Sequence, residues 1–299
     1  MNKLGNFPLK KLIKKWLEAG YLENDVFYKI RTGTPQGGII SPLLANIALH
    51  GMEDALGIEY RRRKCRDGYC YINESKYAVI RYADDFIVLC ESLEDANKVY
   101  ELLEDYLKDR GLTLAPDKTK ITHIDEGFDF LGFNIKRYKG ADKSRVLIKS
   151  SKDNTKSFKK KAKDIVRNCY PNNIEKSIKR LNYLINGVGN YWRMGSNKRI
   201  FNDMDNYLYE ILLRQAKRWH HKKSVGWIVN KYFKISNHPI YKWKWTFTDP
   251  KSGIQVDRMS WIKIRYPKCA RHKSTPYDEE YEDYIINHRN RTPFECLYG

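Results

Sequence analysis

Two adjacent carboxylates, Asp84 and Asp85, have residue types and spacing that could do chemistry. Apolar runs flank them at residues 76–81 and 86–90, and both runs are rich in the β-branched and aromatic residues that strands favour. The short gap between these runs predicts a hairpin with the carboxylates at its tip. Oxygen ligands at such a tip suit Mg²⁺, which proteins bind through one or two carboxylates together with substrate phosphates. An ordinary acidic turn remains an alternative, because Asp is common in turns.

A glycine-rich segment at residues 33–42 is the second candidate for ligand contact. It ends at Ser41 and Pro42, which fit the N-cap and the first position of a helix predicted over residues 42–56. Glycines let the backbone approach a ligand, and a helix start favours phosphate. The amide of Gln36 can both donate and accept hydrogen bonds to a nucleotide. A plain connector before a helix is the alternative interpretation.

The elements that would position these segments follow from hydrophobic periodicity. Helices are expected over residues 8–20 and 92–110, and strands over residues 26–31, 119–124 and 128–135, the last leading into a hairpin that ends near residue 148. Lys118 falls in a turn after Pro116 and is either a phosphate contact or a solvent-facing lysine. Residues 57–75 carry a run of basic residues and predict a solvated loop, for which nucleic-acid contact and a plain exposed insertion both remain open.

Composition points to a polyanionic partner. The 299 residues carry a formal net charge of +20, which favours RNA or DNA. An anionic membrane surface fits less well, because the sequence has no transmembrane run. The six cysteines form no CxxC pair, so we expect reduced thiols and no zinc site. Tyrosines and tryptophans interleave with basic residues, as suits stacking on bases.

From about residue 151 the pattern becomes helical and strongly basic. Helices are predicted over residues 154–168, 173–186, 198–220 and 224–232, with a glycine-containing link at residues 187–193. Residues 214–223 hold a dense group of cations able to bind phosphates, which includes Arg214, Lys217 and Arg218. Residues 243–264 then read as strand-like and aromatic, and residues 266–299 as loop-like.

The motifs, taken in order, resemble the reverse transcriptases encoded by group II introns. The resemblance rests on Thr34-Pro35-Gln36-Gly37-Gly38, Ser41-Pro42-Leu43-Leu44-Ala45-Asn46-Ile47, Tyr82-Ala83-Asp84-Asp85, Pro116-Asp117-Lys118-Thr119-Lys120 and Phe130-Leu131-Gly132-Phe133. It continues into a segment similar to the maturase-specific helical domain, also called domain X or thumb, through Asn186-Gly187, Tyr191-Trp192-Arg193, Asp205-Asn206-Tyr207-Leu208 and Ala216-Lys217-Arg218-Trp219. The order and spacing of these motifs are more specific than any one of them.

The resemblance implies an α+β fold. Residues 1–150 would form the C-terminal part of a polymerase palm, an antiparallel sheet with packed helices. Residues 151–235 would form the helical maturase domain. Residues 236–299 would be a small extension that looks like the start of a DNA-binding region, without the paired cysteines and histidines of an intact HNH nuclease.

The resemblance also implies roles for particular residues. Asp84 and Asp85 would be the catalytic palm carboxylates and the ligands of Mg²⁺ in an RNA-directed DNA polymerase. The implied nucleotide contacts are Pro35, Gln36, Gly37, Ala83 and Lys118, and the implied primer contacts are Phe130, Leu131, Gly132 and Phe133. The basic helices would hold group II intron RNA or the template–primer nucleic acid, and we assign this binding to Lys160, Arg193, Arg214, Lys217 and Arg218.

One departure from the family pattern sets the expectations for activity. The family's first catalytic Asp lies well upstream of the Pro-Gln-Gly loop, and the 33 residues before that loop do not match its segment. We therefore expect little polymerase activity from this chain alone, unless a separate N-terminal fragment completes the palm. A non-catalytic RNA-binding splicing factor and a decayed gene product are the alternatives. The expected location is the cytoplasm of a prokaryote or an organelle of a eukaryote.

Overall fold

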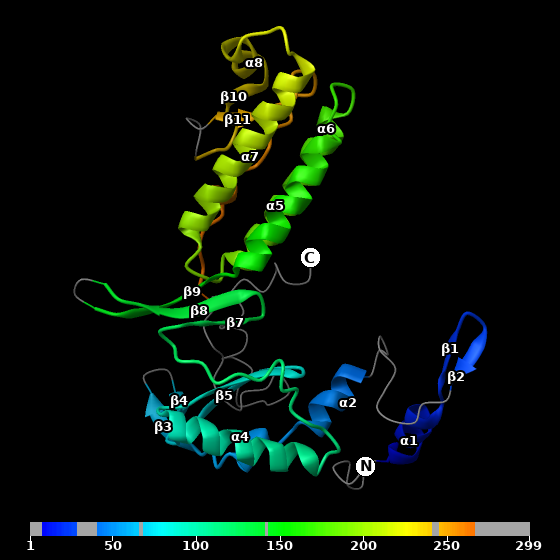
Figure 1. Cartoon of the computed structure of the whole chain (residues 1–299), viewed down its shortest axis with the longest axis vertical. Coiled ribbons are helices and arrows are strands. Elements are labelled where there is room, and N and C mark those ends of the chain that lie inside the picture. Colours follow the sequence, from blue (N-terminus) through cyan, green and yellow to red (C-terminus); the bar gives the residue numbers. More distant parts are fainter. Residues whose placement is uncertain (1–7, 29–40, 66–67, 141–142, 241–244, 267–299) are drawn as a thin grey trace. The chain divides into compact units, whose positions relative to one another are not determined.

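The computed structural model describes residues 8–28, 41–65, 68–140, 143–240 and 245–266. They divide into two compact units, one up to Ile121 and the other from Thr122 onward, and each is described by itself. Both combine helices with small antiparallel sheets (Figure 1), which confirms the predicted α+β class. The domain boundaries at residues 150 and 235 stay predictions.

The first unit consists of short helices and antiparallel hairpins. Its elements are α1 (Lys10–Glu18), β1 (Tyr21–Glu23), β2 (Val26–Tyr28), α2 (Ser41–Ala48), α3 (Met52–Ala55), β3 (Tyr60–Cys65), β4 (Gly68–Asn73), β5 (Ala78–Tyr82), β6 (Asp85–Leu89) and α4 (Leu93–Lys108). The strands pair β1 with β2, β3 with β4 and β5 with β6.

Helix α4 supplies one side of the first unit's core. Ser92 caps its start, because the hydroxyl oxygen accepts a hydrogen bond from the backbone N–H of Asp95 at 3.1 Å. Apolar residues at helical spacing bury one face of α4, among them Val99 and Leu103. They pack with Met52 and with the inner face of the β5–β6 hairpin. The core therefore lies under the hairpin that carries the acidic pair.

Three predictions for this unit are wrong in their details. The helix expected over residues 42–56 is interrupted at Gly51, whose φ of 92° ends the α-helical path between α2 and α3. The basic segment is the paired hairpin β3–β4 and not a loop. The strand expected over residues 119–124 is not formed. The turn before it is present, because the N–H of Lys118 donates to the carbonyl of Ala115 at 3.0 Å.

The second unit joins a three-stranded sheet to a helical bundle. Its elements are β7 (Phe128–Phe130), β8 (Phe133–Tyr138), β9 (Arg145–Ser150), α5 (Lys152–Arg167), α6 (Ile174–Trp192), α7 (Lys198–Trp219), α8 (Val225–Tyr232), β10 (Phe233–Ile235), β11 (Trp245–Phe247) and the 3₁₀ helix η2 (Met259–Trp261). The sheet order is β7-β8-β9, and β10 pairs with β11.

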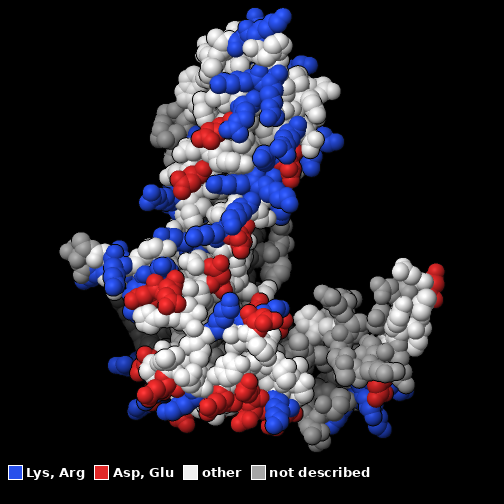
Figure 2. Space-filling view, viewed as in Figure 1, with Lys and Arg blue, Asp and Glu red and all other residues white. Residues whose placement is uncertain are grey.

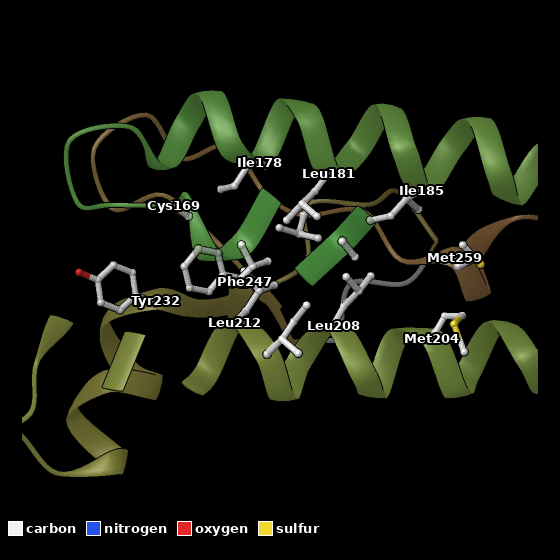
Figure 3. Close-up of a cluster of buried hydrophobic side chains, with 14 of the residues drawn as sticks. Cys169, Ile178, Leu181, Ile185, Met204, Leu208, Leu212, Tyr232, Phe247 and Met259 are labelled. Carbon is white, nitrogen blue, oxygen red and sulfur yellow. The ribbon is translucent and has the colours of Figure 1, made fainter. Parts of the chain in front are cut away.

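The core of this unit lies between α6 and α7. Figure 3 shows Leu181 and Ile185 of α6 facing Leu208 and Leu212 of α7, and all four side chains are buried. Burying an aliphatic side chain of this size stabilises a fold by about 1.5–3 kcal/mol, so this interface contributes much of the unit's stability. Phe247 closes one part of the same cluster.

Two predictions for this unit are wrong for physical reasons that the structure shows. The strand expected over residues 128–135 is a hairpin that turns at Leu131 and Gly132. The link expected over residues 187–193 is the last part of α6. Gly189 is buried in that helix, where an added Cβ would lie 2.2 Å from Cδ1 of Ile262, so the glycine admits the C-terminal segment and does not end the helix.

A buried asparagine joins the sheet to the bundle. Asn197 has no exposed surface, and its Oδ1 accepts a hydrogen bond from the N–H of Ser150, the last residue of β9, at 2.7 Å. Its Nδ2 donates to the carbonyl of Trp192 at 2.7 Å. The N–H of Ser196 donates to the carbonyl of Ile148 at 2.7 Å beside it. The corner between α6 and α7 is thus bonded to the edge of the sheet.

Candidate functional site

The acidic pair lies where β5 turns into β6. Tyr82 and Asp85 are the last paired residues of the hairpin, and Ala83 and Asp84 form the turn between them. Ala83 has a φ of 54°, a left-handed conformation that costs an L-residue roughly 1–2 kcal/mol. Both carboxylates are exposed. The predicted hairpin is confirmed, with Asp84 in the turn and Asp85 beginning the second strand.

A cation that the sequence analysis missed holds this turn. Nη1 of Arg81 donates to the carbonyl of Ala83 at 2.8 Å and to Oδ1 of Asn46 at 2.9 Å. Asn46 lies on α2, so one guanidinium ties the acidic turn to the helix that follows the glycine-rich segment. A basic residue three positions before Asp84 was the available signal, but its strand context gave no reason to orient it toward the turn.

The donor set of the turn fits a hard divalent cation in part. Two exposed carboxylates can contribute oxygens, and the remaining positions would be filled by water or substrate phosphate oxygens. Within the described ranges, no group of three or more acidic, His or Cys side chains is placed to hold a metal ion. The role of Asp84 and Asp85 as ligands of such an ion stays a prediction.

The predicted nucleotide contacts are placed unevenly. Pro35, Gln36 and Gly37 lie outside the described residues. Ala83 lies in the acidic turn, and Lys118 is exposed in the turn that begins at Ala115. The structure thus places Lys118 in solvent, and its role as a phosphate contact stays a prediction.

The predicted primer contacts form a tight turn in the second unit. Leu131 and Gly132 have φ values of 47° and 74° and connect β7 to β8. The hydroxyl of Tyr191 on α6 donates to the carbonyl of Leu131 at 2.6 Å. The carbonyl of Gly132 accepts from Nδ2 of Asn154 and from the N–H of Ser151, both at 3.0 Å. The helical bundle therefore determines the shape of this turn.

Aromatic packing extends the same support. The rings of Phe133 and Tyr191 lie with their centroids 5.1 Å apart, and Phe133 is buried. An added Cβ on Gly132 would lie 2.2 Å from Nδ2 of Asn154, so this position requires glycine for both its φ and its close contact. The primer role of residues 130–133 stays a prediction, and these residues form a turn that contacts with α5 and α6 support.

Basic side chains of α5 and α7 lie next to each other. Nζ of Lys159 is 5.3 Å from the ring centroid of Tyr207, whose hydroxyl donates to the carbonyl of Lys159 at 3.2 Å. Burial raises the pKa of Tyr207, while the nearby charges of Arg214 on α7 and Arg167 on α5 act in the opposite direction. Figure 2 shows Lys and Arg side chains gathered along these helices.

The predicted RNA-binding residues do not all share one place. Lys160 on α5 and Arg214, Lys217 and Arg218 on α7 are exposed. Arg193 is half-buried at the C-cap of α6, where its Nη1 donates to Oδ1 of Asn190 at 3.2 Å. Helix α7 separates it from Arg218, because 22 helical residues span about 33 Å. The structure therefore places Arg193 apart from the cations at the far end of α7.

Asp205 has a structural role in the second unit. It is buried, and its carboxylate accepts from the N–H groups of Met259 and Ser260 at 2.7 and 3.1 Å. Nε of Arg258 lies 3.4 Å from Oδ2. Burial raises the pKa of this carboxyl against the opposing effects of Ser260 and Arg258. The contacts hold η2 against α7.

Comparison with known proteins agrees with the order of these elements. Residues 1–135 match the family model described as reverse transcriptase (RNA-dependent DNA polymerase), and residues 155–233 match the model described as group II intron, maturase-specific domain. The chain therefore resembles the group II intron-encoded reverse transcriptase/maturases in two consecutive segments. The resemblance predicted from the motifs is confirmed.

Individual relatives match parts of this chain. Group II intron-encoded protein LtrA of Lactococcus lactis subsp. cremoris is 32% identical over 183 residues, which cover 45% of this chain and 31% of LtrA. Protein YkfC of Escherichia coli is 34% identical, with coverage of 42% and 38%. An uncharacterized 91 kDa protein in the cob intron of Schizosaccharomyces pombe is 27% identical, with coverage of 84% and 39%. The chain spans about a third of the length of these curated relatives.

Among the described residues, no helix is both long and apolar enough to cross a membrane.

Proposed function

We propose that this chain acts as a group II intron reverse transcriptase/maturase that binds intron RNA and aids splicing and mobility. The observation that carries the proposal is the adjacent basic surface of α5 and α7 inside the segment that matches the maturase-specific domain. Exposed Lys and Arg residues on these helices would meet the phosphates of folded RNA, which is recognised largely through its shape and backbone.

The geometry of the bundle supports RNA binding with little reorganisation. The α5 and α7 backbones are held together by their buried core, and the hydrogen bond from Tyr207 to Lys159 links them near the surface. The cations therefore occupy a surface that is already ordered, which lowers the entropic cost of association. Lys160, Arg214, Lys217 and Arg218 are the proposed contacts on this surface, and Arg193 would be a separate contact.

The polymerase part of the proposal rests on the β5–β6 hairpin. The reverse transcriptase family uses divalent metal ions. In this chain Asp84 and Asp85 would hold Mg²⁺, which when bound supplies positive charge to the reacting phosphates. Arg81 positions the turn, Lys118 would contact the incoming triphosphate, and residues 130–133 would contact the primer of a template–primer duplex.

A binding experiment tests the RNA-binding proposal. The full chain is titrated into a labelled group II intron transcript at several salt concentrations. Replacing Arg214, Lys217 and Arg218 with Gln should weaken binding about 10-fold or more and reduce the slope of log K against log salt by about 2–3, because each cation releases counterions. The matched control replaces Lys176, Lys179 and Arg180, exposed cations of α6, with Gln. Equal losses in both variants would contradict the proposed site.

A second candidate function is a splicing factor that binds RNA without polymerising. The well-packed basic bundle favours it, because RNA binding needs no metal site. Primer extension on an RNA template with Mg²⁺ separates the two candidates, with Asp84→Asn as the control. Extension that Asp84→Asn abolishes supports the polymerase. Splicing that tolerates Asp84→Asn but fails in the α7 variant supports the splicing factor. A partner N-terminal fragment would reveal itself by restoring extension when added.

The proposed location rests on the relatives, which include bacterial proteins and a protein in a cob intron of Schizosaccharomyces pombe. We propose the cytoplasm of a prokaryote or the interior of an organelle.

A further inference from the structure

The β3–β4 hairpin carries a dense positive charge, and none of the contacts proposed above involves it. Arg61, Arg62, Arg63 and Lys64 follow one another along β3, and all four side chains are exposed. Side chains alternate between the two faces of a strand, so Arg61 and Arg63 lie on one face and Arg62 and Lys64 on the other. Residues two apart on one face lie about 6.7 Å from each other. The hairpin therefore presents a pair of cations on each side.

Among the described residues of this hairpin, one ion pair with an acidic side chain is open to solvent. Arg61 forms an ion pair with Glu74 at 3.4 Å, with the two side chains 76% and 53% exposed. An ion pair this open to solvent contributes little free energy of stabilisation. Arg63 and Lys64 lie farther along the strand, toward the hairpin tip.

The root of the hairpin is firmly built. The N–H of Glu59 donates to Oγ of Ser75 at 2.8 Å, and that hydroxyl donates to the carbonyl of Gly57 at 3.1 Å. Nδ2 of Asn73 donates to the carbonyl of Tyr77 at 2.7 Å. Ile58 is buried in the unit's core just before β3 begins. The strand is thus held as an ordered arm, although four adjacent cations repel one another.

Charge is segregated within the first unit. Helix α4, which packs on α3 beside the hairpin, exposes acidic side chains along its length, namely Glu94, Glu101, Glu104 and Asp105. Figure 2 shows acidic side chains gathered over the region that α4 occupies in Figure 1. A polyanion would be attracted to the hairpin and repelled by α4, so the unit has one face that suits such a partner.

We propose that the β3–β4 hairpin is a second RNA-binding element, which takes the phosphodiester backbone of folded RNA. The inference rests on the proposed RNA-binding function and adds a contact in the other unit of the chain. Cations on both faces suit a ligand that offers phosphates on two sides, as the strands that border a groove of folded RNA do. Tyr71, paired with Arg62 in the register, adds a ring beside the charge.

The test compares two double variants of the full chain that lose the same charge. Arg63→Gln with Lys64→Gln removes one cation from each face of the hairpin. Lys98→Gln with Lys108→Gln removes two exposed cations from acidic α4 and is the matched control. The probe is a fluorescein-labelled RNA stem-loop, titrated at several salt concentrations. The hairpin variant should bind about 5- to 10-fold more weakly and lose about 1–2 units of salt slope, and the control should lose less than half as much.

Cross-linking gives a readout of position that does not depend on affinity. A stem-loop containing 4-thiouridine is irradiated with the wild-type chain, and the linked peptides are identified by mass spectrometry. Links within residues 60–73 are expected, together with links on α5 and α7.

The outcomes separate this inference from the proposed function. One outcome would overturn the hairpin's role. In it the wild-type chain binds RNA, the two double variants bind with equal affinity, and no cross-link falls within residues 60–73. The proposed RNA-binding role of α5 and α7 would remain. If the α7 variant loses binding and the hairpin variant weakens binding by the expected amount, the proposed function and the hairpin's role are both supported. Absence of any RNA binding by the wild-type chain would overturn both. Displacement of the RNA by polyglutamate at equal charge concentration would show an acidic polypeptide site and would also overturn the proposal.

Discussion

The chain places its proposed metal ligands and its proposed primer contacts on two tight hairpin turns, one in each unit, and supports the two turns in different ways. Both turns hold a non-glycine residue in the left-handed region, Ala83 with a φ of 54° and Leu131 with a φ of 47°. The turn at Ala83 is exposed, and its described side-chain support comes from Arg81. The turn at Leu131 receives hydrogen bonds from three residues at the start of α5 and the end of α6.

This difference shows how each turn depends on its surroundings. A strained backbone persists where the surrounding structure over-determines it. The turn at Leu131 meets that condition through the folded bundle alone. The acidic turn has fewer supports and carries two adjacent carboxylates that repel each other. We therefore expect a bound cation or substrate to order the acidic turn and to leave the other turn unchanged.

The largest expected effect comes from Gly132→Ala. The new side chain would adopt a φ of 74° and collide with Asn154, whose hydrogen bond to the turn would be lost. We expect the free energy of unfolding of the second unit to fall by about 2 kcal/mol or more. Denaturant unfolding followed by tryptophan fluorescence measures it, since Trp192 lies in that core.

Gly187→Ala is the matched control for this change. Gly187 lies in α6 with nothing within 4 Å of an added Cβ, so alanine there should raise stability by about 0.5–1 kcal/mol. A similar loss in both variants would show that the turn at Gly132 is not the source of the effect.

A smaller effect is expected from Tyr191→Phe. The change removes the 2.6 Å hydrogen bond to the carbonyl of Leu131 and keeps the ring that packs on Phe133. The unfolding free energy should fall by about 1 kcal/mol. Amide hydrogen exchange should quicken in residues 128–138 and stay unchanged in β5 and β6. Exchange that quickens in the acidic hairpin as well would break the contrast between the two turns.

The smallest effect is expected from Ala83→Gly. Glycine adopts the left-handed region freely but loses more chain entropy on folding, so the two contributions nearly cancel. The unfolding free energy of the first unit should change by less than about 1 kcal/mol. Primer extension, where the chain supports it, should fall, because a glycine loosens the turn that carries Asp84. A large loss of stability would show that the turn is held more firmly than its contacts indicate.

The two turns also differ in how well the sequence predicts them. The acidic hairpin was predictable because two apolar runs stop at a polar pair, and a change of residue class marks the turn. The turn at Leu131 was hidden, because apolar residues alternate straight through Phe128, Phe130, Phe133 and Ile135. Gly132 was the available signal, since an isolated glycine in a strand pattern marks a bend or a close approach.

Tertiary contacts account for the remaining errors. Glycines at 187 and 189 favour a helix end by local rules, yet α6 continues through both. Gly189 is needed there because the side chain of Ile262 occupies the space that a Cβ would take. The basic run on β3 looked like a loop, yet pairing with Tyr71 and Ile72 of β4 makes it a strand. Arg81 was missed because its partner Asn46 is 35 residues away in sequence. Local propensity does not contain such contacts.

The buried joint at Asn197 has a mechanical consequence. The side chain of Asn197 forms hydrogen bonds with both the end of β9 and the end of α6. These bonds oppose rotation of the sheet against the bundle. A pull that RNA exerts on α7 would be transmitted to β9, through its pairing to β8, and so to the Leu131 turn. RNA bound to α7 would then affect the position of the Leu131 turn at the other end of the second unit.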